Sequence, residues 1–248
     1  MPSAFTSSLR FRQCCRNVVL ALVGGGLCLA MAAGGQTTAV PASRTLETVL
    51  AGMDQAAARF SSLSADLEYT KVTVIVDDHS TETGKIYFEK TKSQPRVMLA
   101  FQQPAEKYVL FSDGKVSIYR PRIAVIEEYS LTNNQGLLEQ FLLLGFGTPG
   151  SQLQKNYRVS LKGEADWEGT TAVLLELLPK NSAVSSRLER IELWLSTETW
   201  QPLQQTFYEP SKDYLIARYR NSRHNEKLPA KLFALPVRGK VRTVRPQG

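Results

Sequence analysis

Apolar and polar residues alternate along most of the chain after residue 60, in short runs that turn residues separate. In the first run, Leu63, Ala65 and Leu67 alternate with polar residues. A period of two places the apolar side chains of a strand on one face of a sheet, and short turns join antiparallel strands. The pattern therefore predicts a mainly β protein with helices, an α+β fold built on a single meandering antiparallel sheet of about eleven strands.

The later runs give the other expected strands and their turns. Val72, Val74 and Val76 continue the first run in the opposite phase, which predicts a bulge near Lys71. A polar turn is expected at 77–80, and an Asp-Gly pair between two apolar runs predicts a tight hairpin. The further expected strands are 84–90, 97–101, 108–112, 115–119, 123–131, 157–163, 171–178, 190–196, 203–208, 214–221 and a short last one at 240–244.

Two segments have the residue pattern of helices. The first, 45–60, is amphipathic and can be capped by Ser43 or Thr45, and the second, 136–145, is apolar on most of its circumference. A sheet with one apolar face must cover that face, and these two helices are the available cover. A sheet of this width leaves two outcomes open: a packed core, or a curved sheet with a cavity for an apolar ligand.

The first part of the chain has the charge and hydropathy order of a secretory signal peptide. Arg10, Arg12 and Arg16 precede an apolar run at 18–33, which ends in small residues. The run is shorter than the ~20 residues that span a bilayer as a helix. We therefore expect cleavage near Ala32 and export of the remainder, with an uncleaved anchor as the alternative.

The expected organisation is a signal peptide at 1–33, a flexible leader at 34–44 and a single domain at 45–248. All three cysteines lie within the signal, so the mature protein is expected to lack disulfides and thiolate nucleophiles. Without the three arginines of the signal, 27 basic residues stand against 23 acidic ones, a mild excess that argues against nucleic acid as a partner.

The residues typical of catalysis are sparse in the mature sequence. Its two histidines, His79 and His224, lie in polar surroundings far apart in the chain, and no nucleophile elbow or phosphate-binding loop is present. The sequence therefore predicts a protein that is not an enzyme and that needs no metal or other cofactor. Basic residues gather at the C-terminal end, either as a solvated tail or as a contact with anionic lipid. They are Arg238, Lys240, Arg242 and Arg245.

Several short segments, taken in order, resemble the periplasmic outer-membrane lipoprotein carrier family, LolA. The segments are Leu-Ser-Ala-Asp-Leu at 63–67, Gly-Lys-Ile-Tyr-Phe-Glu-Lys at 84–90, Leu-Phe-Ser-Asp-Gly-Lys at 110–115, Ile-Tyr-Arg-Pro at 118–121, Asn-Ser-Arg-His-Asn-Glu-Lys-Leu-Pro at 221–229, Phe-Ala-Leu-Pro at 233–236 and Gly-Lys-Val at 239–241. Their order and spacing, more than any one of them, carry the resemblance, which runs over nearly the whole mature chain.

The resemblance implies a half-open β-barrel of about eleven antiparallel strands covered by a helical lid. It implies a monomeric periplasmic chaperone that shields lipoprotein acyl chains between an inner-membrane lipoprotein-releasing transporter and an outer-membrane lipoprotein acceptor. The residues expected to line the acyl cavity are Val97, Leu99, Phe101 and Leu110. The residues expected in the lid are Leu138, Phe141 and Leu142. Core packing is the competing interpretation of both sets, and a lipid-binding or membrane-signalling module of the same fold is the alternative function.

The chain departs from the family at one point. The family often has a Lys-Arg-Pro segment after the second strand, and its arginine helps to close the lid. Here residues 90–96 read Lys-Thr-Lys-Ser-Gln-Pro-Arg, so no arginine directly precedes the proline. Lys92 and Arg96 are the candidate substitutes, although lysine lacks the planar donor fork of arginine.

Overall fold

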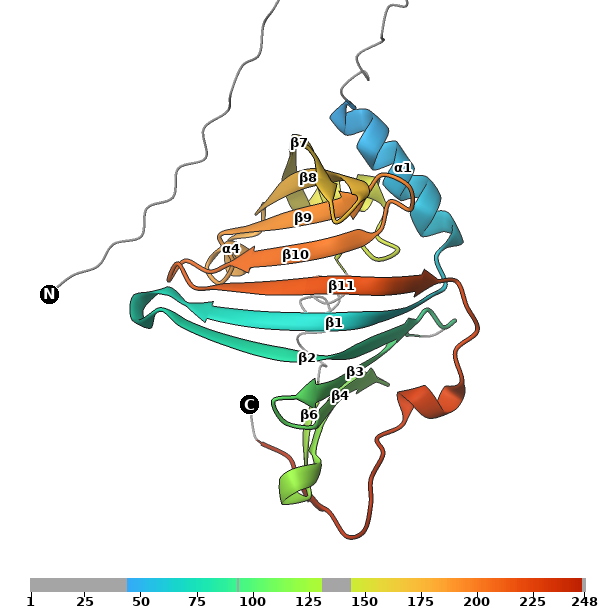
Figure 1. Cartoon of the computed structure of the whole chain (residues 1–248), viewed down its shortest axis with the longest axis vertical. Coiled ribbons are helices and arrows are strands. Elements are labelled where there is room, and N and C mark those ends of the chain that lie inside the picture. The colour runs from blue at the N-terminus through green and yellow to red at the C-terminus, as the bar shows by residue number, and fades with distance from the viewer. Residues whose placement is uncertain (1–43, 93, 131–143, 247–248) are drawn as a thin grey trace, which may run out of the picture. The chain divides into compact units, whose positions relative to one another are not determined.

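Residues 44–92, 94–130 and 144–246 are described by the computed structural model of the chain (Figure 1). They form one sheet of twelve strands in the order β12-β6-β5-β4-β3-β2-β1-β11-β10-β9-β8-β7. The strands are β1 (Ser62–Thr73), β2 (Asp78–Glu89), β3 (Arg96–Gln103), β4 (Lys107–Ser112), β5 (Lys115–Arg120), β6 (Val125–Ser130), β7 (Tyr157–Trp167), β8 (Thr170–Pro179), β9 (Arg190–Ser196), β10 (Pro202–Tyr208), β11 (Tyr214–His224) and β12 (Arg242–Val244). The helices are α1 (Leu46–Arg59), α3 (Gly150–Asn156) and α4 (Ser182–Ser185), and the 3-10 turns are η1 (Val74–Val76), η2 (Pro121–Ile123) and η3 (Ala230–Phe233).

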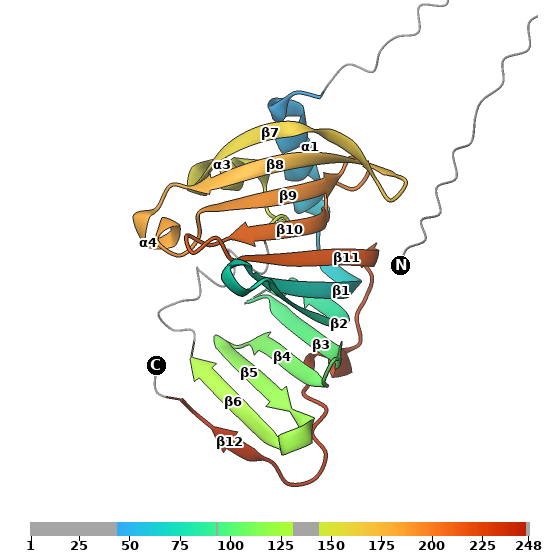
Figure 2. The ribbon, with the colours of Figure 1, turned by 60° about the vertical axis from the view of Figure 1, so that its left-hand side comes forward.

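The sheet is antiparallel except at one edge, where β12 pairs with β6 in parallel. β1 lies near the middle because β11, from late in the chain, pairs along its length. Within the described residues the edge strands β12 and β7 do not pair with each other, so the sheet curls without closing (Figure 2). The predicted fold class is confirmed: a mainly β protein with a single sheet and a few helices.

The end of β1 differs from the sequence prediction. β1 and β2 pair without interruption along the whole of β1, so the predicted bulge near Lys71 is wrong, and the irregularity of β1 lies near its start, against β11. The chain instead leaves the sheet in η1 and turns at Asp77, whose φ of 50° is left-handed. Asp tolerates that conformation better than valine does, which places the turn after the apolar residues. The polar turn predicted at 77–80 therefore belongs mostly to β2.

The helix α1 covers one end of the sheet on its concave face (Figure 1). The Thr45 side chain caps it by accepting a hydrogen bond from the backbone N–H of Thr48 at 3.3 Å, and the helix predicted at 45–60 is confirmed. The buried residues of α1 are Val49, Leu50, Gly52, Met53, Ala56 and Ala57. The second predicted helix, 136–145, falls mostly outside the described residues, and α3 just beyond it is absent from the sequence prediction.

The C-terminal segment after β11 crosses the outer face of the sheet (Figures 1 and 2). Its turn η3 lies against β3, where the guanidinium carbon of Arg96 is 4.6 Å from the centre of the Phe233 ring. The segment then adds β12 to the edge of β6, which confirms the strand predicted at 240–244. β12, which lies near the end of the described residues, thus covers the backbone hydrogen-bonding groups along the edge of β6.

Candidate functional site

An apolar cavity of about 470 Å³ opens on the concave face of the sheet, between β1 to β4 on one side and β10 and β11 on the other. Alternate residues of each strand point into it, as the period of two requires. Its apolar lining consists of Leu67, Tyr69, Ile86, Leu99, Phe101, Val109, Phe111, Leu188, Phe207, Leu215, Ala217 and Tyr219. The cavity has the size and the apolar lining of a small-molecule site.

Two of the four residues predicted for the acyl cavity, Leu99 and Phe101, line it. Val97 shares their face but lies among the packed side chains of the apolar cluster beside the cavity. Leu110 lies on the opposite face, because it pairs with Met98 in the ladder of β3 and β4. The cavity-facing residues of β4 are Val109 and Phe111, whose partners Leu99 and Val97 point inward.

The register of β4 against β3, and not the alternation within β4, distinguishes Val109 and Phe111 from Leu110. The strand reads Tyr-Val-Leu-Phe and is apolar on both faces, so the pattern alone leaves its phase open. Pairing it in register with the strand before it would have settled the phase. The lid residues predicted from the resemblance, Leu138, Phe141 and Leu142, lie outside the described residues.

The mouth of the cavity carries an ion pair beside two aromatic rings. Lys107 Nζ lies 2.6 Å from both carboxylate oxygens of Glu82 and 4.4 Å from the centre of the Phe101 ring. The Tyr69 ring meets Phe101 edge-on, with 6.0 Å between centroids. Burial raises the pKa of Tyr69 to about 12, and the negative charges of Glu82 and Glu209 add to that shift. The lining is therefore charged around Lys107 and Glu82, while most of the other lining residues are apolar.

A buried chain of hydrogen bonds runs through the wall of the cavity at Tyr219 and Gln205. The Tyr219 hydroxyl donates to Gln205 Oε1 at 2.7 Å, and Gln205 Nε2 donates to the carbonyl oxygen of Leu144. Burial raises the pKa of Tyr219, so this hydroxyl stays protonated. Phe146 packs edge-on against Tyr219, with centroids 4.8 Å apart. The segment that follows residue 143 is thereby fixed across the concave face.

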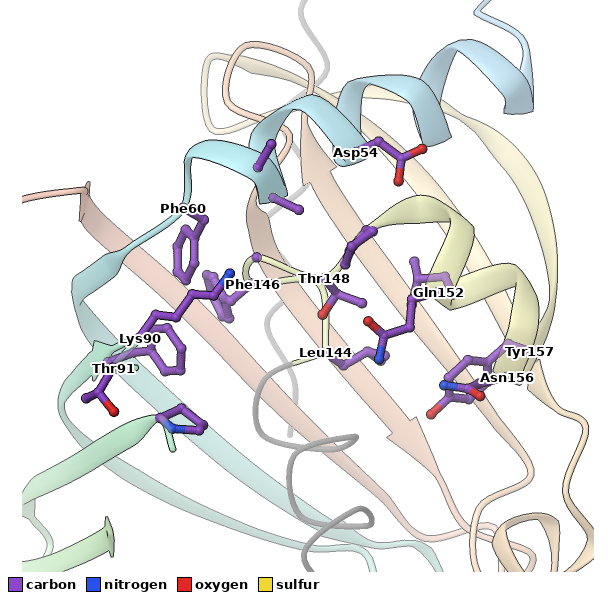
Figure 3. Close-up of a pocket in the computed structure, with 17 residues that line it drawn as sticks. Asp54, Phe60, Lys90, Thr91, Leu144, Phe146, Thr148, Gln152, Asn156 and Tyr157 are labelled. Carbon is purple, nitrogen blue, oxygen red and sulfur yellow. The ribbon is translucent and has the colours of Figure 1, made fainter. Parts of the chain in front are cut away.

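A second hollow, of about 960 Å³, lies between α1, α3 and the segment around Phe146 (Figure 3). Its wall has apolar members such as Phe60, but Figure 3 also shows Asp54, Lys90 and Gln152 around it. Polar side chains along the walls suit a hydrated cleft better than an acyl chain, since burying them without partners costs free energy. The smaller, apolar cavity is the better candidate for a lipid site.

The candidate substitutes for the lid arginine lie elsewhere. Arg96 bonds Glu89 through its guanidinium and stacks on Phe233, on the face of the sheet that η3 covers. Lys92 is exposed in the loop before β3. Neither side chain is among those that line the apolar cavity. In this structure Arg96 thus contacts the C-terminal segment at Phe233, while the residues predicted for the lid lie outside the described residues.

The two histidines stand at opposite ends of β1, since His79 pairs with Val72 and His224 with Leu63. Within the described residues no group of three His, Cys, Asp or Glu side chains is placed to hold a metal ion. Helices long and apolar enough to cross a membrane are also absent from the described part of the chain.

No protein-family model matches the chain, and no curated protein matches its sequence. Solved structures do match: a crystal structure of MucB has a TM-score of 0.51 at 18% identity, over 79% of this chain and 65% of that one. An uncharacterized conserved protein from Thermus thermophilus has a TM-score of 0.50 at 12% identity, over 82% of this chain and 100% of that one.

A putative outer membrane lipoprotein-sorting protein domain from Vibrio parahaemolyticus aligns with a TM-score of 0.41 at 14% identity, over 76% of this chain and 97% of that one. Of the MucB structure, the alignment covers 65%, so this chain spans slightly less than two thirds of the length of MucB. At such identities the likeness to MucB and to the Thermus protein establishes a shared fold, an open curved antiparallel sheet with helices, and nothing finer.

Proposed function

We propose that this chain is a periplasmic carrier that shields the acyl chains of lipoproteins in the apolar cavity on the concave face of its sheet. One observation carries the proposal: an open cavity of about 470 Å³ in which 12 of the 17 lining residues are apolar, most of them from six strands. The signal-like segment at 1–33 supports export, and the resemblance of the sequence to the carrier family supports the cargo.

The physical need for such a cavity is clear from the cost of exposing a lipid. Each acyl methylene left in water costs ~0.8 kcal/mol, so a free chain does not cross an aqueous compartment unaided. A carrier without an energy source must hold the chain well enough to shield it and weakly enough to release it. Shielding here comes from Leu99, Val109 and their inward-facing neighbours, none of which needs a specific partner on the ligand.

The polar mouth suits the other end of such a ligand. Lys107 has 24% of its side chain exposed and lies where the cavity meets solvent, so its ammonium can meet an ester or phosphate oxygen. The hydrogen bond from Lys107 to Glu82 holds the ammonium over the Phe101 ring. In this proposal the acyl chains lie inside and the polar linkage stays at Lys107.

A second candidate is a lipid-binding or membrane-signalling module that transfers no lipoprotein. The position of Arg96 supports this candidate, because Arg96, a candidate substitute for the missing lid-closing arginine, binds Glu89 and stacks on Phe233. The fold that this chain shares with MucB is compatible with either function.

Native mass spectrometry of the mature protein purified from the periplasm, with lipid extraction of what accompanies it, tests the proposal. A bound acylated lipoprotein, together with transfer of that lipoprotein between membrane fractions, is the expected result. A bound free lipid without transfer would select the lipid-binding module. A protein that carries nothing and ignores an apolar fluorescent probe would contradict both functions.

A further inference from the structure

Two segments that are far apart in the sequence meet at one corner of the sheet (Figure 2). The turn η2 joins β5 to β6, and β12 pairs with β6 so that Arg242 stands opposite Val125. The backbone N–H of Arg242 donates to the carbonyl oxygen of Ala124 at 2.9 Å. We call this surface the basic corner and define it by Arg122, Ile123, Val237, Arg238, Lys240 and Arg242.

The cations of the basic corner are free to meet an external anion. Its four cations are exposed, and within the described residues none of them has an ion-pair partner. The neighbouring carboxylates of β6 are already engaged, Glu127 with Arg120 and Glu128 with Arg245. Glu106 is a further acid near Arg238, and it accepts a hydrogen bond from Tyr108.

Apolar side chains stand exposed among these cations. Ile123 at the tip of η2 is 59% exposed, and Val237 in the segment before β12 is 41% exposed. The backbone holds Ile123 there, because Ala124 takes a left-handed φ of 50° and its N–H bonds the carbonyl oxygen of Pro121 at 3.1 Å. The turn therefore presents an aliphatic side chain at a fixed site rather than on a loose loop.

We propose that the basic corner docks the protein on the surface of a bilayer that contains anionic phospholipids. Lipid phosphates attract the cations, each worth about 1 kcal/mol, or about fivefold in affinity, near a charged membrane. The aliphatic side chains of Ile123 and Val237 gain from entering the boundary between headgroups and acyl chains. A nucleic acid would use the cations but would offer these aliphatic groups no comparable environment, since its stacking partners are aromatic or guanidinium groups.

The basic corner and the mouth of the cavity lie at the same end of the sheet. β3 and β5 run in the same direction, because each is antiparallel to β4, so the turns that follow them lie at the same end of the sheet. Lys107, at the cavity mouth, begins β4 at that end. Docking at the basic corner brings the mouth close to the bilayer. The docking itself does not rest on the proposed carrier function.

Co-sedimentation of the mature protein with vesicles tests the proposal. The vesicles consist of phosphatidylcholine alone or of an equal mixture with phosphatidylglycerol. The variant carries Arg238→Glu and Lys240→Glu, both in the segment before β12. The matched control carries Lys155→Glu and Arg158→Glu, two exposed cations at the opposite edge of the sheet, so its net charge changes equally. Circular dichroism confirms that both variants fold.

We expect binding to the anionic vesicles only, weakening with salt. Binding should fall more than about 25-fold in the corner variant, at about fivefold per cation, and far less in the control. Ile123→Ser should lose a few-fold without any change of charge. Equal losses in the two charge variants, or binding of a DNA oligonucleotide in place of vesicles, would overturn the assignment. Phe101→Glu should keep vesicle binding while losing acyl ligands, so the docking proposal and the carrier proposal fail separately.

Discussion

The two halves of the concave face start from the same kind of sequence and end in different states. In the half formed by β8 and β9, Leu175, Leu193 and Leu195 are fully buried, because α1 lies directly over them. In the half formed by β3 and β4, Leu99 and Val109 keep a small exposure and border the 470 Å³ cavity. Both halves show the same alternation of apolar residues, and among the described residues they differ in that the helix α1 covers one of them.

The difference shows that alternation decides which face of a strand is buried, while the cover decides whether that face becomes packed core or borders a cavity. α1 can approach β8 and β9 closely because Gly52 meets the indole of Trp200 without a side chain of its own. In the described residues, the corresponding cover of the other half is the short segment around Phe146. It contacts Tyr219, which lines the cavity.

The largest expected effect is a difference in stability loss when a leucine of each half is truncated to alanine. Leu193→Ala, in the packed half, should lower the free energy of unfolding by about 2–5 kcal/mol, since it leaves a void among side chains held on all sides. Leu99→Ala should cost clearly less, because Leu99 already borders an open cavity and loses fewer neighbours. Urea denaturation of both variants measures the difference, and equal losses would mean that the cavity half is packed in solution.

A smaller loss of stability is expected from a substitution where α1 packs against Trp200. A Cβ on Gly52 would lie 2.3 Å from the Trp200 ring, so Gly52→Ala must displace either the ring or the helix. Such overpacking costs about 1–3 kcal/mol. Ala51→Ser, at the neighbouring exposed position, serves as the control and should change little. A neutral or stabilising Gly52→Ala would show that α1 does not pack this closely.

The smallest effect concerns pH and the boundary between the halves. Burial lowers the pKa of His224, which lies 6.4 Å from the Phe60 ring between ring centres. The unfolded chain therefore binds the proton more readily, and stability falls as the pH drops below about 6.5, until the folded-state pKa is reached. His224→Gln should flatten the stability profile between pH 7 and pH 5. Identical profiles for the parent protein and the His224→Gln variant would contradict a buried, neutral His224.

Much of the sheet was predictable from local pattern, because the strands keep a period of two and short turns separate them. The phase of β4 was not, because its outer face is also apolar. Met98, beside Leu110, is buried on that outer face, where η3 and Phe233 lie against β3. That contact joins residues more than a hundred positions apart, so no local window contains it.

The prediction for the end of β1 was wrong for a related reason. Val74 and Val76 look like strand residues in the sequence, yet both are exposed in a 3-10 turn that ends at Asp77. The position of a left-handed residue decided the turn, and hydrophobicity did not. The pairing of β12 with β6, which creates the basic corner, likewise depends on the long C-terminal segment and leaves no local signal beyond its charges.

Binding of a fluorescent acyl probe by Leu99→Glu and Leu110→Glu tests most directly whether the cavity half holds acyl chains. The two substitutions put the same carboxylate into neighbouring strands, one inside the cavity and one on the outer face. We expect Leu99→Glu to lose more than about tenfold in affinity, because a carboxylate in an apolar cavity is costly to desolvate, and Leu110→Glu to bind as the parent does. Phe101→Glu, nearer the mouth, replaces Leu99→Glu should that variant fail to fold. Folded variants that all bind the probe equally well would contradict the account.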